Sequence, residues 1–169
     1  MKSLLALVAL AISLITASGC NQNQESFRVS SGSDEAPPPD PRAETMWGHN
    51  IITAQSRAKK NGTLILLDFT GSDWCPPCMA LHDFVLTQPE FLNYAEKNLE
   101  LVELDFPKNK SIDEKLAESN ARLAEKYNIE GFPTIIVLNA AGEIVHRDVG
   151  YSGKNAKAYT ANLQKTLGR

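Results

Sequence analysis

The sequence predicts an α/β fold in which a central mixed sheet of about four strands is flanked by helices. The apolar run at residues 63–69 has the character of a strand buried on both faces, and helical segments precede and follow it. Later in the chain, strand-like runs at 134–138 and 144–149 flank residues 139–142 (NAAG), which is typical of a hairpin. Strands separated by helices favour parallel pairing, and the hairpin adds antiparallel strands.

The first helix is expected at residues 47–61. Gly62 suits the left-handed position that commonly closes a helix. Four apolar residues recur at helical spacing and would form one stripe: Trp47, Ile51, Ala54 and Ala58.

Three further helices are expected, at residues 79–98, 112–127 and 155–167. Pro89 fits the first turn of a helix better than its middle, so the first of these should break near residues 87–89. A strand is expected at 99–105. Right-handed crossover places it beside the strand at 63–69 and leaves the other side of that strand for the hairpin.

Two cysteines with C-x-x-C spacing lie between the strand at 63–69 and the following helix, in residues 74–78 (WCPPC). At the start of a helix the dipole favours a thiolate, which predicts Cys75 as the nucleophile. Cys78, one turn later, is expected to be more buried and to act as the resolving thiol. The pair therefore predicts a reversible disulfide at the carboxyl end of a central strand, where open α/β sheets keep their sites.

Two other readings of the cysteine pair remain open. A static disulfide is one, although a loop this short gains little stability from closure. A metal site formed by both thiols and His82 is the other, but zinc requires four ligands, and His49 and His146 lie far away in sequence. We expect no bound cofactor or metal.

The N-terminal residues predict export. Lys2 followed by the apolar stretch at 4–15 has the form of a signal peptide, expected to cover residues 1–19. Residues 17–20 (ASGC) resemble the lipobox of bacterial lipoproteins, which implies lipidation of Cys20; ordinary signal-peptidase cleavage nearby is the alternative. The polar, proline-rich residues 20–44 are expected to form a disordered tether, and residues 45–169 the folded domain.

Composition limits the partners. The 169 residues are 43% hydrophobic and 22% charged, as in an ordinary globular protein. The formal net charge of −3 gives no basic surface for nucleic acid. We expect one core, a monomer and no nucleic-acid partner.

Three segments resemble the thioredoxin superfamily, in particular its exported, bacterial thioredoxin-like branch: residues 69–78 (FTGSDWCPPC), 127–138 (YNIEGFPTIIVL) and 142–150. The combination of C-x-x-C with G-F-P-T at residues 131–134 makes the resemblance specific. It implies a thioredoxin fold without the usual first strand. It also implies thiol-disulfide oxidoreduction.

The resemblance also implies roles for the residues around the dithiol. Pro133 would follow a cis peptide bond in a loop facing the cysteines, and the Phe132 backbone would pair with an extended substrate segment. Thr134 and Trp74 would complete the substrate surface, with Trp74 shielding one side of Cys75.

Asp68 matches the family's buried acid beneath the dithiol, which implies proton transfer to and from Cys78. Burial in an apolar strand should raise its pKa. Glu103 stands where the family has a lysine, Asp83 stands where it has a helix-kinking proline, and residues 108–119 form a longer insertion. Asp73 is expected to be solvated.

These expectations lead to an exported, membrane-tethered enzyme that reduces disulfides of envelope proteins and receives electrons from a membrane donor. Cys20 would attach it to the lipid bilayer. A thiol-oxidising enzyme and a non-catalytic copper- or zinc-binding module are the alternatives.

Overall fold

The computed structural model describes residues 35–169. The signal peptide predicted at residues 1–19 and the lipidation predicted at Cys20 lie outside these residues. Within the described part of the chain, no helix has the length and apolar character needed to cross a bilayer.

A five-stranded mixed sheet forms the centre of the domain, in the order β1-β3-β2-β4-β5. The first three strands run parallel, while β4 is antiparallel to both β2 and β5. The predicted α/β class is therefore confirmed, as is the placement of the third strand and the hairpin on opposite sides of β2. The strands are β1 (Trp47–Gly48), β2 (Leu64–Thr70), β3 (Leu99–Asp105), β4 (Thr134–Leu138) and β5 (Ile144–Val149).

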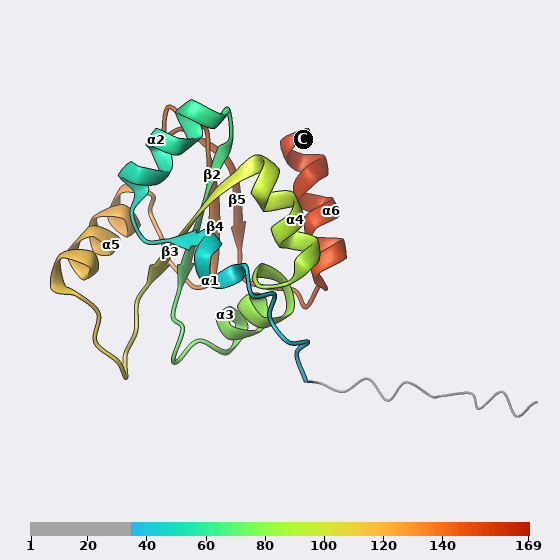
Figure 1. Cartoon of the computed structure of the whole chain (residues 1–169). Coiled ribbons are helices and arrows are strands. Elements are labelled where there is room, and N and C mark those ends of the chain that lie inside the picture. Colours follow the sequence, from blue (N-terminus) through green and yellow to red (C-terminus); the bar gives the residue numbers. More distant parts are fainter. Residues whose placement is uncertain (1–34) are drawn as a thin grey trace, which may run out of the picture. The chain divides into compact units, whose positions relative to one another are not determined.

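Helices cover both faces of the sheet. Figure 1 shows α2 (Ile51–Asn61) and α5 (Glu114–Lys126) on one side of it and α4 (Pro89–Asn98) and α6 (Ala156–Leu167) on the other. All seven residues of β2 are buried. Because side chains alternate along a strand, Leu66 packs into the cluster with α4 and α6, and Leu67 packs into the cluster with α2. This explains why β2 reads as a continuous apolar run.

The start of the domain differs from the prediction. Helix α2 begins at Ile51, where Asn50 accepts hydrogen bonds from the amides of Ile52 (2.9 Å) and Thr53 (3.2 Å). Trp47 instead lies in β1, which pairs with β3, so the expectation of a missing first strand is wrong. Trp47 stacks on Phe91 in one core cluster, whereas Ile51 packs against the other. Their helical spacing was a coincidence.

Residues 37–44, which we call the strap, lie against the domain, although the sequence predicted a disordered tether there. The amide of Asp40 donates to the carbonyl of Thr87 (2.9 Å), and Gln88 Nε2 donates to the carbonyl of Pro37 (3.3 Å). Ala43, at the start of the short helix α1 (Ala43–Met46), is buried. The folded domain therefore includes the strap, and its boundary lies before residue 45.

The helix that follows the dithiol changes its hydrogen-bond pattern at His82. It consists of α3 (Pro76–Leu81) and a π-helical turn, η1 (His82–Leu86). The amide and hydroxyl of Thr87 both bond to the carbonyl of His82, at 3.1 and 3.0 Å. The predicted break is confirmed, since α4 starts at Pro89. A π-turn, a known cause of helix kinks, thus contains Asp83, which stands where the family has its proline.

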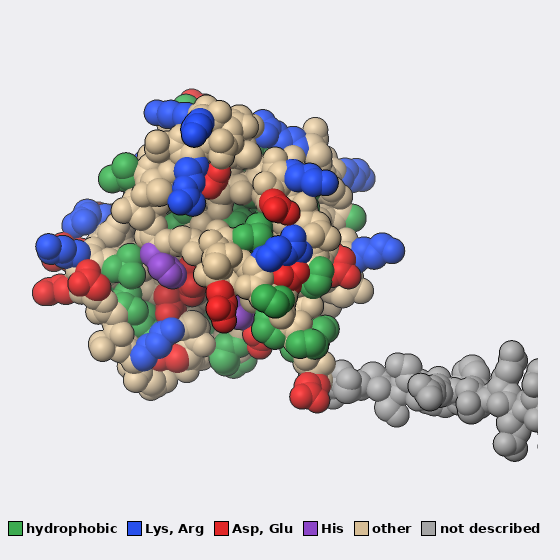
Figure 2. Space-filling model, in the orientation of Figure 1, with side chains coloured by type: hydrophobic (Ala, Val, Ile, Leu, Met, Phe, Trp, Pro, Cys, Tyr) green, Lys and Arg blue, Asp and Glu red, His purple; other side chains and the backbone are tan. Residues whose placement is uncertain are grey.

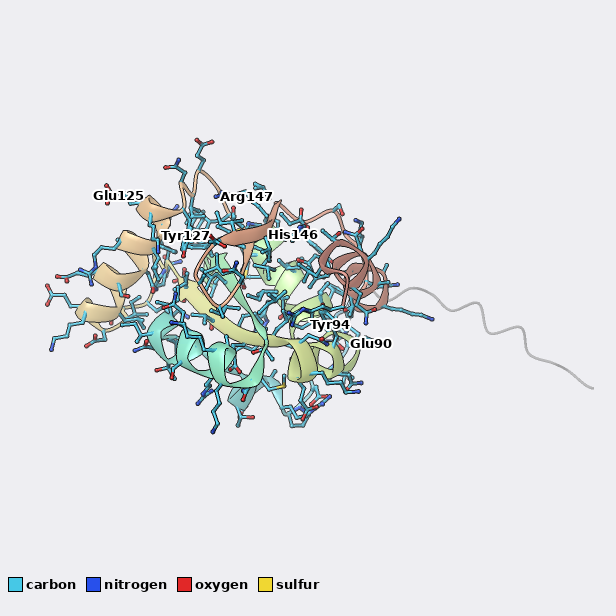
Figure 3. The ribbon with its side chains drawn as sticks, turned by 90° about the horizontal axis from the view of Figure 1, so that it is seen from above. Glu90, Tyr94, Glu125, Tyr127, His146 and Arg147 are labelled. Carbon is cyan, nitrogen blue, oxygen red and sulfur yellow. A yellow bond between two sulfur atoms is a disulfide. The ribbon has the colours of Figure 1, made fainter. Side chains whose placement is uncertain are left out.

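The remaining elements follow local signals. Asp113 caps α5 and Asn155 caps α6 through side-chain oxygens that accept backbone amides. Strands β4 and β5 have the predicted bounds. Figure 3 shows Arg147 of β5 near Tyr127, and its guanidinium donates to the carbonyl of Tyr127 just after α5. A cation at this helix end complements the helix dipole.

Candidate active site

Cys75 and Cys78 form a disulfide at the carboxyl end of β2. Cys75 precedes the first turn of α3, and Cys78 lies within that helix. Both are buried, with Cys75 4% and Cys78 2% exposed. The Cys78 amide donates to the carbonyl of Cys75 (3.0 Å), while Pro76 and Pro77 have no amide hydrogen to donate.

The loop before Cys75 is closed by Trp74. Its indole Nε1 donates to the carbonyl of Phe106 (2.7 Å), and the ring lies over Gly71. A Cβ at position 71 would lie 2.5 Å from the indole, so only glycine fits there. The Cys75 amide then bonds to the Gly71 carbonyl at 3.0 Å. The glycine that separates the strand from the dithiol therefore allows the tight turn.

The second predicted motif lies directly beside this loop. The rings of Trp74 and Phe132 meet edge to face, with centroids 5.7 Å apart, and Phe106 contacts Phe132 at 5.2 Å. Phe132 therefore touches the residue that precedes Cys75. The aromatic contacts bring together segments more than 50 residues apart in sequence, residues 74 and 132.

The loop at residues 131–134 contains a cis peptide bond between Phe132 and Pro133. The Pro133 carbonyl accepts the amide of Gly150 (2.8 Å). Within residues 35–169, no hydrogen bond involves the Phe132 backbone. Thr134 was expected to contact substrate, but its side chain is buried and its hydroxyl donates to the Gly131 carbonyl (2.7 Å). Its hydroxyl holds the loop together instead of lining the surface.

Asp68 is a buried acid on β2. It is 4% exposed, and its Oδ1 has no hydrogen-bond partner within the described residues. Glu103 is its register partner on β3. Burial, followed by repulsion from Glu103 and Asp105, raises the pKa of Asp68 to about 8. The side chain therefore holds a proton at neutral pH and can exchange it near pH 8.

A cavity of about 380 Å³ brings Asp68 and Cys78 together. Both line it, together with Glu103 and His82. A second cavity of about 530 Å³ lies against the strap and shares Asp68, His82 and Glu103 with the first. In Figure 2, acidic and histidine side chains gather around α1 on this side of the molecule. The buried acid thus borders both cavities.

Asp105 is a site residue that the sequence did not reveal. Its carboxylate accepts the amide (3.0 Å) and hydroxyl (2.7 Å) of Ser72 and pairs with Lys110 Nζ (3.0 Å). Burial acts to raise the pKa of Asp105, but the bonds from Ser72 and Lys110 outweigh it and hold that pKa below its usual value. The end of β3 is thereby joined to the loop at residues 71–75, which we call the active-site loop.

Asp73 was expected to be solvated, but its carboxylate accepts hydrogen bonds from backbone amides. Its carboxylate accepts the amides of Lys108 (2.9 Å), Asn109 (2.6 Å) and Lys110 (3.1 Å). These bonds, that from Lys108 foremost, lower the pKa of Asp73. Lys108 Nζ also lies 3.6 Å from the centroid of the Trp74 ring. The start of the insertion at 108–119 is therefore fastened to the active-site loop.

His82 does not join the cysteines in a metal-binding group. It lines the cavity near Cys78, and its Nδ1 lies 2.8 Å from Asp83 Oδ1. Across residues 35–169, no three side chains of His, Cys, Asp or Glu come together as metal ligands would.

Comparisons with known proteins agree with this geometry. The model of the thioredoxin-like domain family matches residues 52–166. The disulfide bond reductase DsbH of Chlamydia pneumoniae is 31% identical over 125 residues, which cover 74% of each chain. A solved structure of a DsbH oxidoreductase has a TM-score of 0.68 at 28% identity and covers 80% of this chain and 94% of that one.

A second relative from Chlamydia pneumoniae, the thioredoxin-related protein DsbJ, is 28% identical over 102 residues. The match covers 60% of this chain but only 29% of DsbJ, so it concerns one part of that protein. The family match, the mixed sheet and the disulfide between β2 and α3 agree with one another. The chain therefore belongs to the thioredoxin superfamily, as a thioredoxin-like domain with the active-site disulfide of a thiol-disulfide oxidoreductase.

Proposed function

We propose that the protein is an exported, membrane-tethered protein-disulfide reductase that acts through Cys75 and Cys78. One observation carries the proposal: the proton-holding acid Asp68 lines the same cavity as Cys78, one half of a disulfide at the start of a helix. A static disulfide has no need of a buried acid, which costs free energy wherever it is ionised. The reductase named DsbH among the relatives supports the same direction of electron flow.

The chemistry begins from the reduced dithiol. The Cys75 thiolate attacks one sulfur of the substrate disulfide, so a mixed disulfide forms and one substrate thiolate leaves. The ionised fraction of Asp68, which grows as the pH approaches 8, then accepts the proton of Cys78, and the Cys78 thiolate attacks Cys75 Sγ. The second substrate thiolate leaves and takes up a proton, and two electrons have passed from the dithiol to the substrate. A membrane electron donor would restore the dithiol.

The substrate would lie across the loop at residues 131–134. The free backbone of Phe132 can pair with an extended segment in the manner of an added strand. Pro133 has no amide hydrogen to compete for that segment. Trp74 offers an aromatic wall beside Cys75. We propose disulfide-containing proteins of the cell envelope as the substrates.

Reduction of insulin with a dithiol donor tests the proposal. The wild-type protein should accelerate insulin precipitation, and Cys75→Ser should abolish the acceleration because the nucleophile is gone. Cys78→Ser should accumulate a mixed disulfide through Cys75, since no thiol remains to resolve it. An inactive wild-type protein, or trapping through Cys78 in Cys75→Ser, would contradict the proposal.

The redox potential separates a reductase from the alternative, a thiol-oxidising enzyme. The helix dipole favours the Cys75 thiolate by only about 0.3 to 1 kcal/mol. Against it stand the missing donors at Pro76 and Pro77 and the acids Asp83 and Glu103. Because about 30 mV corresponds to about 1.4 kcal/mol for two electrons, these effects keep the couple within tens of millivolts of thioredoxin, near roughly −270 mV.

Equilibration with glutathione measures this potential. A couple near that of thioredoxin should remain largely oxidised in a mildly reducing mixture. A disulfide that such a mixture reduces completely would identify an oxidant, and the reductase assignment would be dropped.

A further inference from the structure

The cavity beside Cys78 is lined with acids. Asp68 and Glu103 face it from the sheet, and Asp83 faces it from η1. Acids at this place oppose every step that creates negative charge, including loss of the Cys78 proton. Among the described residues that line the cavity, Lys110 is the one lysine or arginine. The position of Lys110 therefore determines how far its positive charge offsets the repulsion between these acids and a new negative charge in the cavity.

Lys110 is held in place at both ends. Its backbone amide donates to Asp73 (3.1 Å), and its Nζ pairs with Asp105 (3.0 Å). Asp73 also binds the two preceding amides, so the loop that carries Lys110 is fastened to the loop that carries Cys75. Without these bonds, a lysine side chain that is half exposed to solvent would sample many rotamers.

We propose that Lys110 is a positioning residue that supplies the counter-charge of this cavity and so speeds the step in which Cys78 resolves the mixed disulfide. The inference rests on the proposed function, because that step belongs to disulfide exchange. In it, the proton moves from Cys78 Sγ to the ionised form of Asp68, the bond from Cys78 Sγ to Cys75 Sγ forms, and the bond from Cys75 Sγ to the substrate sulfur breaks. Lys110 favours the anionic states on both sides of the proton transfer.

Several other charges face Lys110 or the cavity. Asp68, Glu103 and Asp105 come from β2 and β3, Asp73 comes from the active-site loop, and His82 and Asp83 come from η1. The bond to Asp105, with added attraction from Glu103 and Asp73, raises the pKa of Lys110 above its usual value. Lys110 therefore remains charged across the pH range in which Asp68 titrates.

The test uses the full chain with Cys20→Ser in every sample, so that only the active-site thiols react, and the neutral probe 2,2′-dipyridyl disulfide. Reduced protein should release thiopyridone in two phases, attack by Cys75 and then resolution by Cys78. Lys110→Gln should move the pH midpoint of the second phase upward by about 0.5 to 1 unit and slow that phase roughly three- to tenfold below the midpoint, as expected for one lost charge.

Two variants serve as controls. Lys110→Arg keeps the charge and should restore the wild-type midpoint. Lys60→Gln removes the same charge near the end of α2. This helix precedes the amino end of β2, whereas the dithiol follows the carboxyl end of that strand. The variant should therefore leave the midpoint unchanged. An unmoved midpoint in Lys110→Gln, or equal shifts in Lys60→Gln or Lys110→Arg, would overturn the inference. Because the probe is not a protein, this result stands apart from insulin reduction: inactivity on insulin with the expected midpoint shift would reject only the proposed function.

Discussion

Asp68 shows how a single buried side chain links chemistry to stability. Its pKa is about 8 in the folded protein and 3.8 in the reference state, because burial and the nearby acids disfavour its charge. A raised pKa means that the folded state binds the proton more tightly than the unfolded state. The stability from this proton is complete below pH 3.8 and is lost as the pH rises towards 8.

Asp68→Asn should remove that pH dependence. Between about pH 4 and pH 8, wild-type stability should fall relative to the variant by up to about 1.4 kcal/mol per pH unit, so the variant gains most at high pH. Urea unfolding of the oxidised protein at several pH values measures the difference. Glu125→Gln, an exposed change on α5 (Figure 3), should keep the wild-type pH dependence. Parallel curves for wild type and Asp68→Asn would contradict the raised pKa.

The role of a residue could be predicted where a short local sequence motif indicates it. The C-x-x-C pair and the G-F-P-T loop are short motifs, and burial of Asp68 follows from the apolar strand around it. The roles of Asp73 and Asp105 were not predictable, because these residues bind groups more than 30 positions away in sequence, and the position of Lys110 depends on both of them. A carboxylate that binds backbone amides 35 to 37 residues away leaves no local pattern.

At the scale of elements, prediction succeeded where two independent signals agreed. The hairpin strands have an apolar pattern and a turn between them, and their bounds match those expected. The break before α4 was visible in Pro89. The predicted start of α2 was wrong, because the helical spacing of Trp47 and Ile51 extended the expected helix past Asn50, the residue that caps α2 in the structure. Strand β1 is only two residues long and exists through its pairing with β3, so no pattern within it could reveal it.

The turn between β2 and α3 depends on a glycine under Trp74. Gly71→Ala should destabilise the protein by about 1 to 3 kcal/mol, because the new methyl group collides with the indole. Gly48→Ala is the matched control, since its Cβ would meet only the Leu101 carbonyl at 3.7 Å, and it should cost less. Thermal or urea unfolding measures both.

A double variant assigns the cause. In Gly71→Ala with Trp74→Ala, the colliding ring is absent, so the combined loss should be smaller than the sum of the single losses. Additive losses, or equal losses for the two glycine variants, would mean that the indole is not the obstacle.

For the whole molecule, the sequence predicts an export signal and a lipidated Cys20 ahead of the thioredoxin-like domain. If Cys20 is acylated, mass spectrometry of the mature protein should find lipid on that residue, and the protein should fractionate with membranes. Cys20→Ala should then release it, because acyl chains bind a bilayer by about 0.8 kcal/mol for each buried methylene. Wild-type protein that is soluble and begins at another residue would reject the anchor.

The hydrogen bonds of the strap determine where a force applied to the N-terminal end of the domain would act first. Its bonds to Thr87 and Gln88 fasten the N-terminal entry of the chain to the junction of η1 and α4, and Pro39 and Asp40 form part of the wall of the larger cavity beside Asp68. A pulling force on the N-terminal end would load these few bonds before it strained the sheet. Peeling the strap away would remove part of that wall and expose Asp68, which would lower its pKa because burial is the main cause of the raised value.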